Sequence, residues 1–270
     1  MCAVDVKISD LKIGAQLILG KYGVRNNIPF PVMWLKCTPN SDFITQSAVD
    51  YLPFDANEPD NDEFRGYGNP NYGLSNLLAF MNSADESWYR PTHSTDTPPD
   101  MMHTTRSSQY QSHYGFLYHF EEYEIESLVK TTVEVSGERV TSAIRLPSSE
   151  ELSGAQRFEL FQRKGIRAKG TEDMIANRLG HNFDYNSFIP VWVRNKSVHF
   201  VKSALCLSRN CNLDTVSPRN SSGLRPVCTI NPDTPVILGE DGYYYIKPRP
   251  VQRNVYTDEE LFELLGLAQP

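Results

Sequence analysis

The sequence predicts an α+β fold with a β-rich core, short helices and long loops. Short strand-like apolar segments recur at both ends of the chain, whereas segments with the helical period of about 3.6 residues are few and short. The 270 residues include 18 Pro and 16 Gly, which indicates many turns and disfavours a helical bundle. With 40% hydrophobic residues, the chain is long enough to bury a sizeable core.

The first third of the chain is predicted to form a β-meander. Residues 6–14 alternate between apolar and polar side chains, as a strand with one buried face does. Residues 15–22 continue this strand, and residues 31–37 and 43–46 form two further short strands. Residues 53–73 follow as a long loop, because they are rich in Pro, Asp, Asn and Gly and poor in aliphatic side chains.

The middle of the chain contains the predicted helices. Four apolar side chains share one face of a helix over residues 74–83, and Asn71 or Ser75 is its predicted cap. A second long loop over residues 90–113 precedes a helix over residues 121–128.

A hairpin follows, with strands over residues 130–135 and 139–145 and a turn at Ser136-Gly137. Ser148 starts the next helix, because its hydroxyl group accepts hydrogen bonds from the free amides of a first helical turn. Residues 158–161 add more helix.

The last third of the chain returns to β-structure. Its predicted strands cover residues 189–193, 197–203, 224–230 and 243–246. Residues 256–267 form an amphipathic helix that begins at a capping box. Because no linker interrupts the chain before this helix, we predict a single domain over residues 1–250 and a helical tail over residues 251–270.

Composition restricts the partners and the compartment. The formal net charge of −7 argues against binding of nucleic acid, because phosphate backbones repel an acidic protein. The basic stretch over residues 163–169 is interpreted as a solvated helix end or loop. No apolar run approaches the roughly 20 residues of a membrane span, and no signal-peptide pattern opens the sequence. Five irregularly spaced cysteines favour reduced thiols and synthesis in a cytosol.

Motifs of catalysis and cofactor binding do not stand out. The sequence contains neither a nucleophile elbow nor a phosphate-binding or dinucleotide-binding glycine motif, so we predict no cofactor. Four histidines lie in or near the second loop: His93, His103, His113 and His119. They lack the close-spaced pairs typical of zinc sites, which favours ordinary loop residues. Four carboxylates crowd the first loop: Glu58, Asp60, Asp62 and Glu63. A solvated acidic loop is the favoured interpretation, and a calcium site is the alternative.

The closing third resembles an uncharacterised domain family that is frequent in phage and prophage genomes and typically ends in W-W-L-R-S … G-V-R-P-A. The resemblance rests on Trp192-Val193-Arg194-Asn195 and Gly223-Leu224-Arg225-Pro226. Earlier features follow the family's order and extend the resemblance over most of residues 8–230. They are a strand over residues 13–22, a Trp-containing strand over residues 31–35, a short helix ending at residues 80–83, and the segment over residues 146–152.

The resemblance implies a C-type-lectin-like fold, of the kind shared by formylglycine-generating enzymes and phage receptor-binding variable proteins. Its framework signature consists of Trp192, Arg194, Asn195, Gly223, Arg225 and Pro226. Trp192 is expected to face the core. Arg194 and Arg225 are expected to pair with buried carboxylates or carbonyls, and Gly223 to allow a tight entry into a central strand.

The cysteine pair Cys206 and Cys211 provides an enzymatic alternative. From spacing alone, a disulfide, a Cu(I) site or no joint role are all open, and no joint role is favoured. Formylglycine-generating enzymes, however, carry a Cys-x-x-x-x-Cys pair upstream of a Gly-Phe-Arg-Cys ending, and here Gly223-Leu224-Arg225-Pro226-Val227-Cys228 follows. That resemblance implies a copper-dependent oxidase, although the flanking pattern of those enzymes is missing.

The main expectation from the resemblance is a non-catalytic phage structural or accessory protein of the capsid, neck, baseplate or tail. It would be made in the host cytoplasm and then join the virion. Its expected partners are other virion proteins, further copies of itself, or a host-surface glycan or protein. Aromatic residues in or beside the two long loops either contact such a partner or pin the loops to the body. They are Tyr67, Tyr72, Trp88, Tyr89 and Tyr110.

Overall fold

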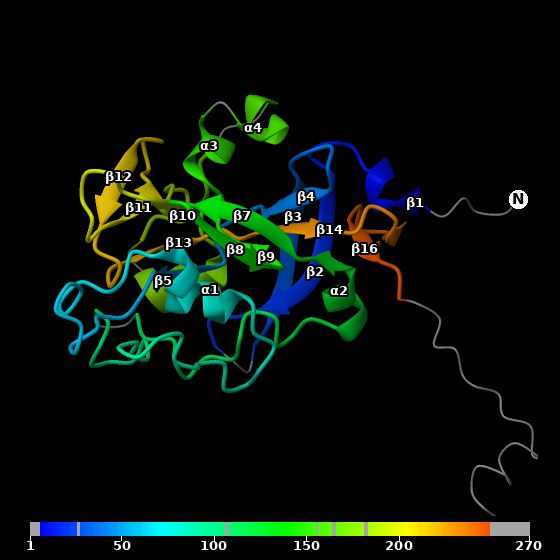
Figure 1. The fold of residues 1–270 in the computed structure, drawn as a ribbon. Helices are drawn as coiled ribbons and strands as arrows, with labels where there is room; N and C mark the ends of the chain where they lie inside the picture. The colour runs from blue at the N-terminus through cyan, green and yellow to red at the C-terminus, as the bar shows by residue number, and fades with distance from the viewer. Residues whose placement is uncertain are drawn as a thin grey trace, which may run out of the picture.

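The computed structural model describes residues 6–25, 28–105, 108–154, 156–163, 166–180 and 183–248. Over these ranges the protein is a mixed α+β, strand-rich fold with few short helices and a curled main sheet (Figure 1). The predicted α+β class with a β-rich core, short helices and long loops is therefore confirmed. The predicted C-terminal helix over residues 256–267 lies outside the described residues.

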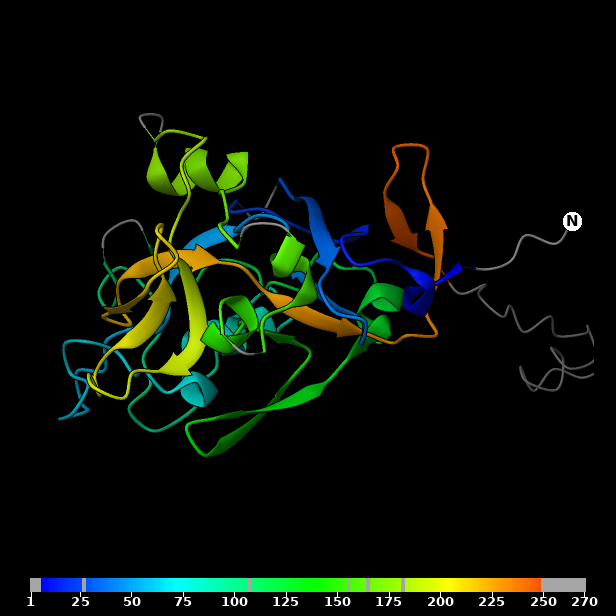
Figure 2. The ribbon, with the colours of Figure 1, turned by 90° about the horizontal axis from the view of Figure 1, so that it is seen from above.

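The main sheet has nine described strands in the order β1-β15-β16-β2-β3-β4-β14-β6, and β9 also pairs with β14. The bounds are β1 Val6–Lys7, β2 Gln16–Tyr22, β3 Phe30–Lys36, β4 Asp42–Thr45, β6 Leu128–Val129, β9 Ile144–Arg145, β14 Val227–Ile230, β15 Pro235–Leu238 and β16 Tyr244–Ile246. Strands β2, β3 and β4 are consecutive antiparallel neighbours, which confirms the predicted meander. The hairpin of β15 and β16 extends from the body (Figure 2).

The second sheet has five described strands in the order β12-β11-β10-β13-β5. Their bounds are β5 Asp50–Pro53, β10 Val191–Lys196, β11 Ala204–Leu207, β12 Leu213–Val216 and β13 Ser221–Leu224. Most pairs are antiparallel, but β10 and β13 run parallel. Strand β5 therefore carries the first third of the chain into a sheet that otherwise comes from the last third.

Short helices and one separate hairpin complete the described fold. The helices are α1 Asn76–Met81, α2 Glu122–Ser127, α3 Ser149–Leu152, α4 Glu159–Arg163 and α5 Glu172–Met174, and a π-helical turn over Ile175–Leu179 continues α5. Ser75 caps α1 and Ser148 caps α3, each through its hydroxyl oxygen. The hairpin joins β7 Thr131–Val135 to β8 Glu138–Ser142, and its turn residues Ser136 and Gly137 both have positive φ.

Two predicted strands are wrong. Residues 6–14 contain only the two-residue strand β1, followed by the 3-10 turn Ile8–Asp10, in which Ile8 alone is buried. Residues 197–203 form an exposed turn between β10 and β11, although Val198, Phe200 and Val201 suggest a strand. In both segments apolar residues without a pairing partner produced a false strand signal.

The core consists of two clusters on opposite faces of the strands. Neighbouring residues of β10 alternate between them: Trp192 belongs to the first cluster, whereas Val191 and Val193 belong to the second. The first cluster runs from Ile8 to Ile246 and includes residues of both sheets. The second cluster does so too, since it contains Ile44 and Val191, and the two sheets therefore share both clusters.

Candidate functional site

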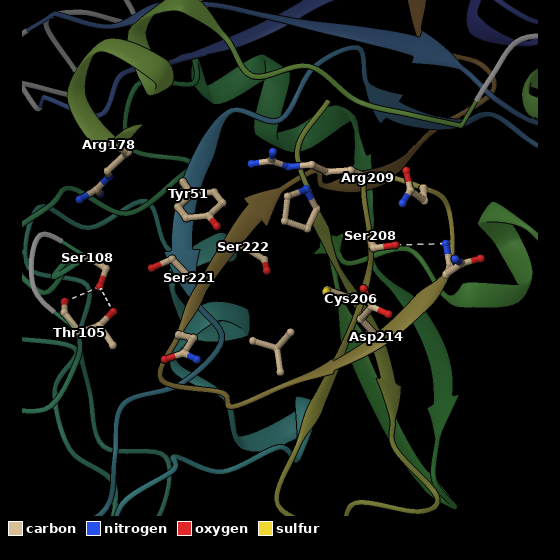
Figure 3. Close-up of a pocket in the computed structure, with 15 residues that line it drawn as sticks. Tyr51, Thr105, Ser108, Arg178, Cys206, Ser208, Arg209, Asp214, Ser221 and Ser222 are labelled. Atoms are coloured by element: carbon tan, nitrogen blue, oxygen red, sulfur yellow. Dashed lines mark hydrogen bonds between the residues drawn. The ribbon is translucent and has the colours of Figure 1, made fainter. Parts of the chain in front are cut away.

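A groove of about 880 Å³ lies at one end of the five-stranded sheet (Figure 3). It exists because β10 begins only at Val191, which pairs with Leu207 on one side and with Gly223 on the other. The hairpin between β11 and β12 and the first residues of β13 extend past this start. No described strand lies between the β11–β12 hairpin and the start of β13 at this level of the sheet, and Pro190 lines the resulting gap.

Backbone contacts fix the hairpin that forms one wall of the groove. The amide of Ser208 donates to the carbonyl of Asn212 at 2.8 Å, and the amide of Cys211 donates to the carbonyl of Ser208 at 2.9 Å. Cys211 has a φ of 64°, which closes this tight turn. Arg209, Asn210 and Asn212 are thereby held at the groove.

The lining of the groove is polar and mostly uncharged. Hydroxyl and amide side chains come from a segment in the middle of the chain and from two neighbouring segments of its last third: Thr105, Ser108, Ser208, Asn210, Asn212, Asn220, Ser221 and Ser222. Tyr51 adds an aromatic ring, and Arg209 and Asp214 add one charge of each sign. Arg178 is the third charged residue of the lining, and its charge is balanced by Asp50. In Figure 3, Ser221 and Ser222 on β13 face Ser208 and Asp214 across the opening.

One groove hydroxyl has no hydrogen-bond partner among the described residues. The oxygen Oγ of Ser221 is buried and unpaired, whereas its neighbour Ser222 is hydrogen-bonded to Cys206. Buried polar atoms are nearly always paired in folded proteins, and of the five unpaired side-chain atoms among the described residues, Ser221 Oγ belongs to a residue that lines the groove. Ser221 therefore offers a ligand both a donor and an acceptor.

A buried ion pair fixes one of the side chains that line the groove. Arg178, which lines the groove from the π-helical turn, donates to the carboxylate of Asp50 at 2.8 and 3.2 Å. Tyr22 donates its hydroxyl hydrogen to the same carboxylate. Burial alone would raise the pKa of Asp50, but the charge and hydrogen bonds of Arg178 hold that pKa below its ordinary value. Burial lowers the pKa of His113, which lies beside Arg178, to about 4.

The predicted framework arginines pair as expected. Arg194 is buried and donates to the carboxylate of Glu151 and to the carbonyl of Leu146. Arg225 is buried and donates to the carbonyls of Thr45 and Ile166 at 3.0 and 2.7 Å. Arg194 therefore has a buried carboxylate and a carbonyl as partners, and Arg225 has two carbonyls.

The remaining framework residues also lie at structural positions. Trp192 is fully buried, and its indole Nε1 donates to the carbonyl of Leu52 at 2.7 Å. Asn195 accepts from the amide of Ser149 at 2.7 Å and so joins β10 to α3. Gly223 lies in β13, where an added Cβ atom would come within 2.8 Å of the Pro190 carbonyl oxygen. Pro226 accepts from the amide of Thr45 at 3.1 Å through its carbonyl oxygen.

The loop aromatics divide into two groups. Tyr72, Trp88 and Tyr110 are buried in the first core cluster, so the expectation of partner contact is wrong for them. They instead anchor the loops to the core. Trp88 stacks on Tyr110 with ring centroids 5.3 Å apart, and the amide of Leu146 donates to the Tyr72 hydroxyl oxygen. Tyr89 is half-buried, and Tyr67 is exposed beside Lys202.

The two cysteines of the oxidase alternative lie in different surroundings. Cys206 is buried in the first core cluster and lines the groove, whereas Cys211 packs against the second cluster. Both are free thiols. Burial raises the pKa of Cys206 to about 11, although its hydrogen bond with Ser222 opposes this shift. A thiol of this kind is a poor nucleophile at neutral pH.

Metal ligands do not gather in the described part of the chain, where no group of three or more His, Cys, Asp or Glu side chains has a metal-binding arrangement. His103 instead contacts Asp100 at 2.8 Å. Glu58, the buried member of the acidic loop, is engaged by His93 at 2.7 Å and by Thr95 at 3.1 Å. Among the described helices, none is both long and apolar enough for a membrane crossing.

No protein-family model, curated protein or solved structure matches this chain. The groove and its framework are therefore the basis for an inference of function.

Proposed function

We propose that the protein is a non-catalytic phage structural or accessory protein that holds a partner in the polar groove. The observation that carries the proposal is the groove lining, in which uncharged hydrogen-bonding side chains surround the Tyr51 ring and include the unpaired hydroxyl of Ser221. Binding sites of proteins combine a shaped surface with a few such placed polar groups.

A glycan is the partner that this lining favours. Sugar hydroxyls both donate and accept hydrogen bonds, and serine hydroxyls and asparagine amides do the same. Asp214 and Arg209 add one acceptor group and one donor group of opposite charge, and the third charged lining residue, Arg178, is ion-paired with Asp50. This balance of charge favours a neutral ligand over a strongly charged one. Tyr51 offers a ring face for the apolar side of a sugar.

The framework supports a C-type-lectin-like architecture as part of the same proposal. Trp192, Arg194 and Arg225 carry structural roles and leave the adjoining groove free to vary. A stable framework that presents a variable polar surface is what the resemblance to phage receptor-binding proteins implies. Location in the host cytoplasm during assembly, and then in the virion, follows from that resemblance.

Purification of particles tests the structural role. Phage particles from a producing host are separated on a density gradient, and the protein is quantified by mass spectrometry against the major capsid protein. We expect a constant ratio to the capsid protein across the particle peak. A protein that stays entirely in the soluble fractions would overturn the structural role.

A copper-dependent oxidase is the second candidate, and one observation favours it: Cys206 lines the groove, where a substrate thiol would bind. The test measures copper content after reconstitution with Cu(I), and oxygen uptake with a cysteine-containing peptide. The binding role predicts no stoichiometric copper and no peptide-dependent oxygen uptake. Copper at one equivalent, lost together with oxygen uptake in Cys206→Ser and Cys211→Ser, would replace the binding role with the enzyme.

A further inference from the structure

A second cavity, separate from the groove residues, has an apolar interior. It measures about 310 Å³ and lies between β3, the turn after β4 and the start of α5. Its inner lining includes the buried side chains of Tyr22, Val32 and Val49. This volume is at the lower end of the range of small-molecule sites, so the cavity suits an apolar ligand group about the size of one ring.

An exposed aromatic residue marks the cavity. Phe30, at the first position of β3, lines the cavity and is 47% exposed. A large apolar side chain costs free energy when it faces water, and a ligand body packed against it would remove that cost. The cavity thus offers aromatic surface from Phe30 at one side and from Tyr22 inside.

The charges of the cavity are of one sign. Glu172 and Asp173 line it, and no described lysine or arginine does. The Asp173 carboxylate accepts from the amide of Val24 and from the side-chain amide of Asn177, both at 2.7 Å. These hydrogen-bond partners are neutral and orient the carboxylate. Arg178 also interacts electrostatically with Asp173, but its ion pair is with Asp50. Glu172 is exposed and makes no ion pair with a described residue.

We propose that this cavity binds a small organic cation, namely a protonated amine attached to an apolar, ring-sized body. The apolar interior takes the ring, and the amine lies beside Glu172 and Asp173. An aromatic face also attracts a cation, which adds to the preference over a neutral molecule of the same shape. The two carboxylates repel an anion, and the apolar lining disfavours a saccharide. The lining residues of this cavity differ from those of the groove, and the proposal does not rest on the function proposed for the groove.

Three probes of nearly equal shape test the charge preference. Binding of 2-phenylethylamine, 2-phenylethanol and 3-phenylpropanoate to the full chain is measured by ligand-observed NMR titration at pH 7. We expect the amine to bind with a Kd below about 10 mM, a limit set by weak ligand efficiency for nine non-hydrogen atoms. The alcohol is expected to bind at least about 3-fold more weakly and the acid more weakly still.

Two variants locate the site. Glu172→Gln keeps the shape of the side chain and removes one exposed charge. It should weaken binding of the amine about 3-fold and leave binding of the alcohol unchanged. Ser47→Phe fills the cavity and should abolish binding of both the amine and the alcohol. Glu240→Gln, at an exposed residue of the β15–β16 turn that does not line the cavity, is the matched control and should change nothing. Equal affinity for all three probes, absence of amine binding, or an unchanged amine affinity in Glu172→Gln would overturn the proposal, whether or not Ser47→Phe folds.

Discussion

Arg194 donates two hydrogen bonds to the carboxylate of Glu151, at 2.6 and 3.1 Å, and thereby joins β10 to α3. A second arginine, Arg145, reaches the same carboxylate at 2.8 Å. Burial alone would raise the pKa of Glu151, but the hydrogen bond from Arg194 and the charge of Arg145 lower it below its ordinary value. This buried network holds β10 in place, and the groove lies beyond the first residue of that strand.

Removal of Arg194 is expected to destabilise the fold strongly. Arg194→Met keeps the apolar length of the side chain but leaves Glu151 with a single cationic partner in a buried site. Such losses cost about 3 kcal/mol or more of the free energy of unfolding, which urea denaturation monitored by circular dichroism measures. Arg209→Met, on the exposed hairpin, is the control and should stay within about 0.5 kcal/mol. A loss below about 1 kcal/mol in Arg194→Met would contradict the structural role.

Gly223 is expected to tolerate no side chain. In Gly223→Ala, the new Cβ atom would lie 2.8 Å from the Pro190 carbonyl oxygen and 2.9 Å from Ile189 Cδ1. Backbone must shift to relieve this contact, which costs about 1–3 kcal/mol and alters the groove beside Pro190. Gly66→Ala meets no atom within 4 Å and serves as the control. Thermal unfolding of the two variants gives the comparison, and equal melting temperatures would refute the predicted clash.

His113 is expected to make stability depend on pH between about 6.5 and 4. Burial lowers its folded-state pKa to about 4, so the unfolded chain binds a proton in this window while the folded chain does not. The free energy of unfolding therefore decreases by up to about 3 kcal/mol as pH falls from about 6.5 to 4. Urea unfolding at several pH values should show a shallower decline in His113→Gln. Parallel declines in the two proteins would exclude this role of His113.

Cys206 is expected to react slowly with alkylating reagents. Its pKa of about 11 leaves little thiolate at pH 8, and its side chain is buried. Cys211 is partly exposed and should react first. Time-resolved mass spectrometry of the native protein after addition of iodoacetamide assigns each modification. Modification of Cys206 ahead of Cys211 would indicate an activated thiol and would favour the oxidase.

The framework could be predicted from the sequence because its signals are local. Trp192 stands in a strand-like apolar segment, and Arg194 and Arg225 lie two residues from core positions, where long charged side chains need buried partners. Local signals also predict Ser148 as a cap and leave Asn71 or Ser75 as the cap of the first helix, where the structure has Ser75. Strand β5 was missed because it is four residues long and ends in Pro53 at the start of a loop.

The groove could not be predicted, because its parts are brought together only by the fold. Ser221 and Asp214 are ordinary polar residues in their own segments, and their convergence depends on where β10 begins. Asp50 and Arg178 are separated by 128 positions in sequence, so no local pattern links them. The loop aromatics show the opposite error, since composition alone does not distinguish an exposed contact residue from a buried pin such as Trp88.

Binding of glycans to the groove is the most direct test of the proposed function. Wild-type protein is screened by biolayer interferometry against immobilised bacterial surface polysaccharides, and each positive interaction is repeated with Asn212→Ala, Asp214→Ala and the control Glu240→Ala. We predict that at least one neutral polysaccharide binds to the wild-type protein. Asp214→Ala should weaken this binding about 10-fold, whereas Glu240→Ala should leave it unchanged. Absence of any glycan binding, or equal binding by Asp214→Ala and wild-type protein, would contradict the assignment of the groove as a glycan site.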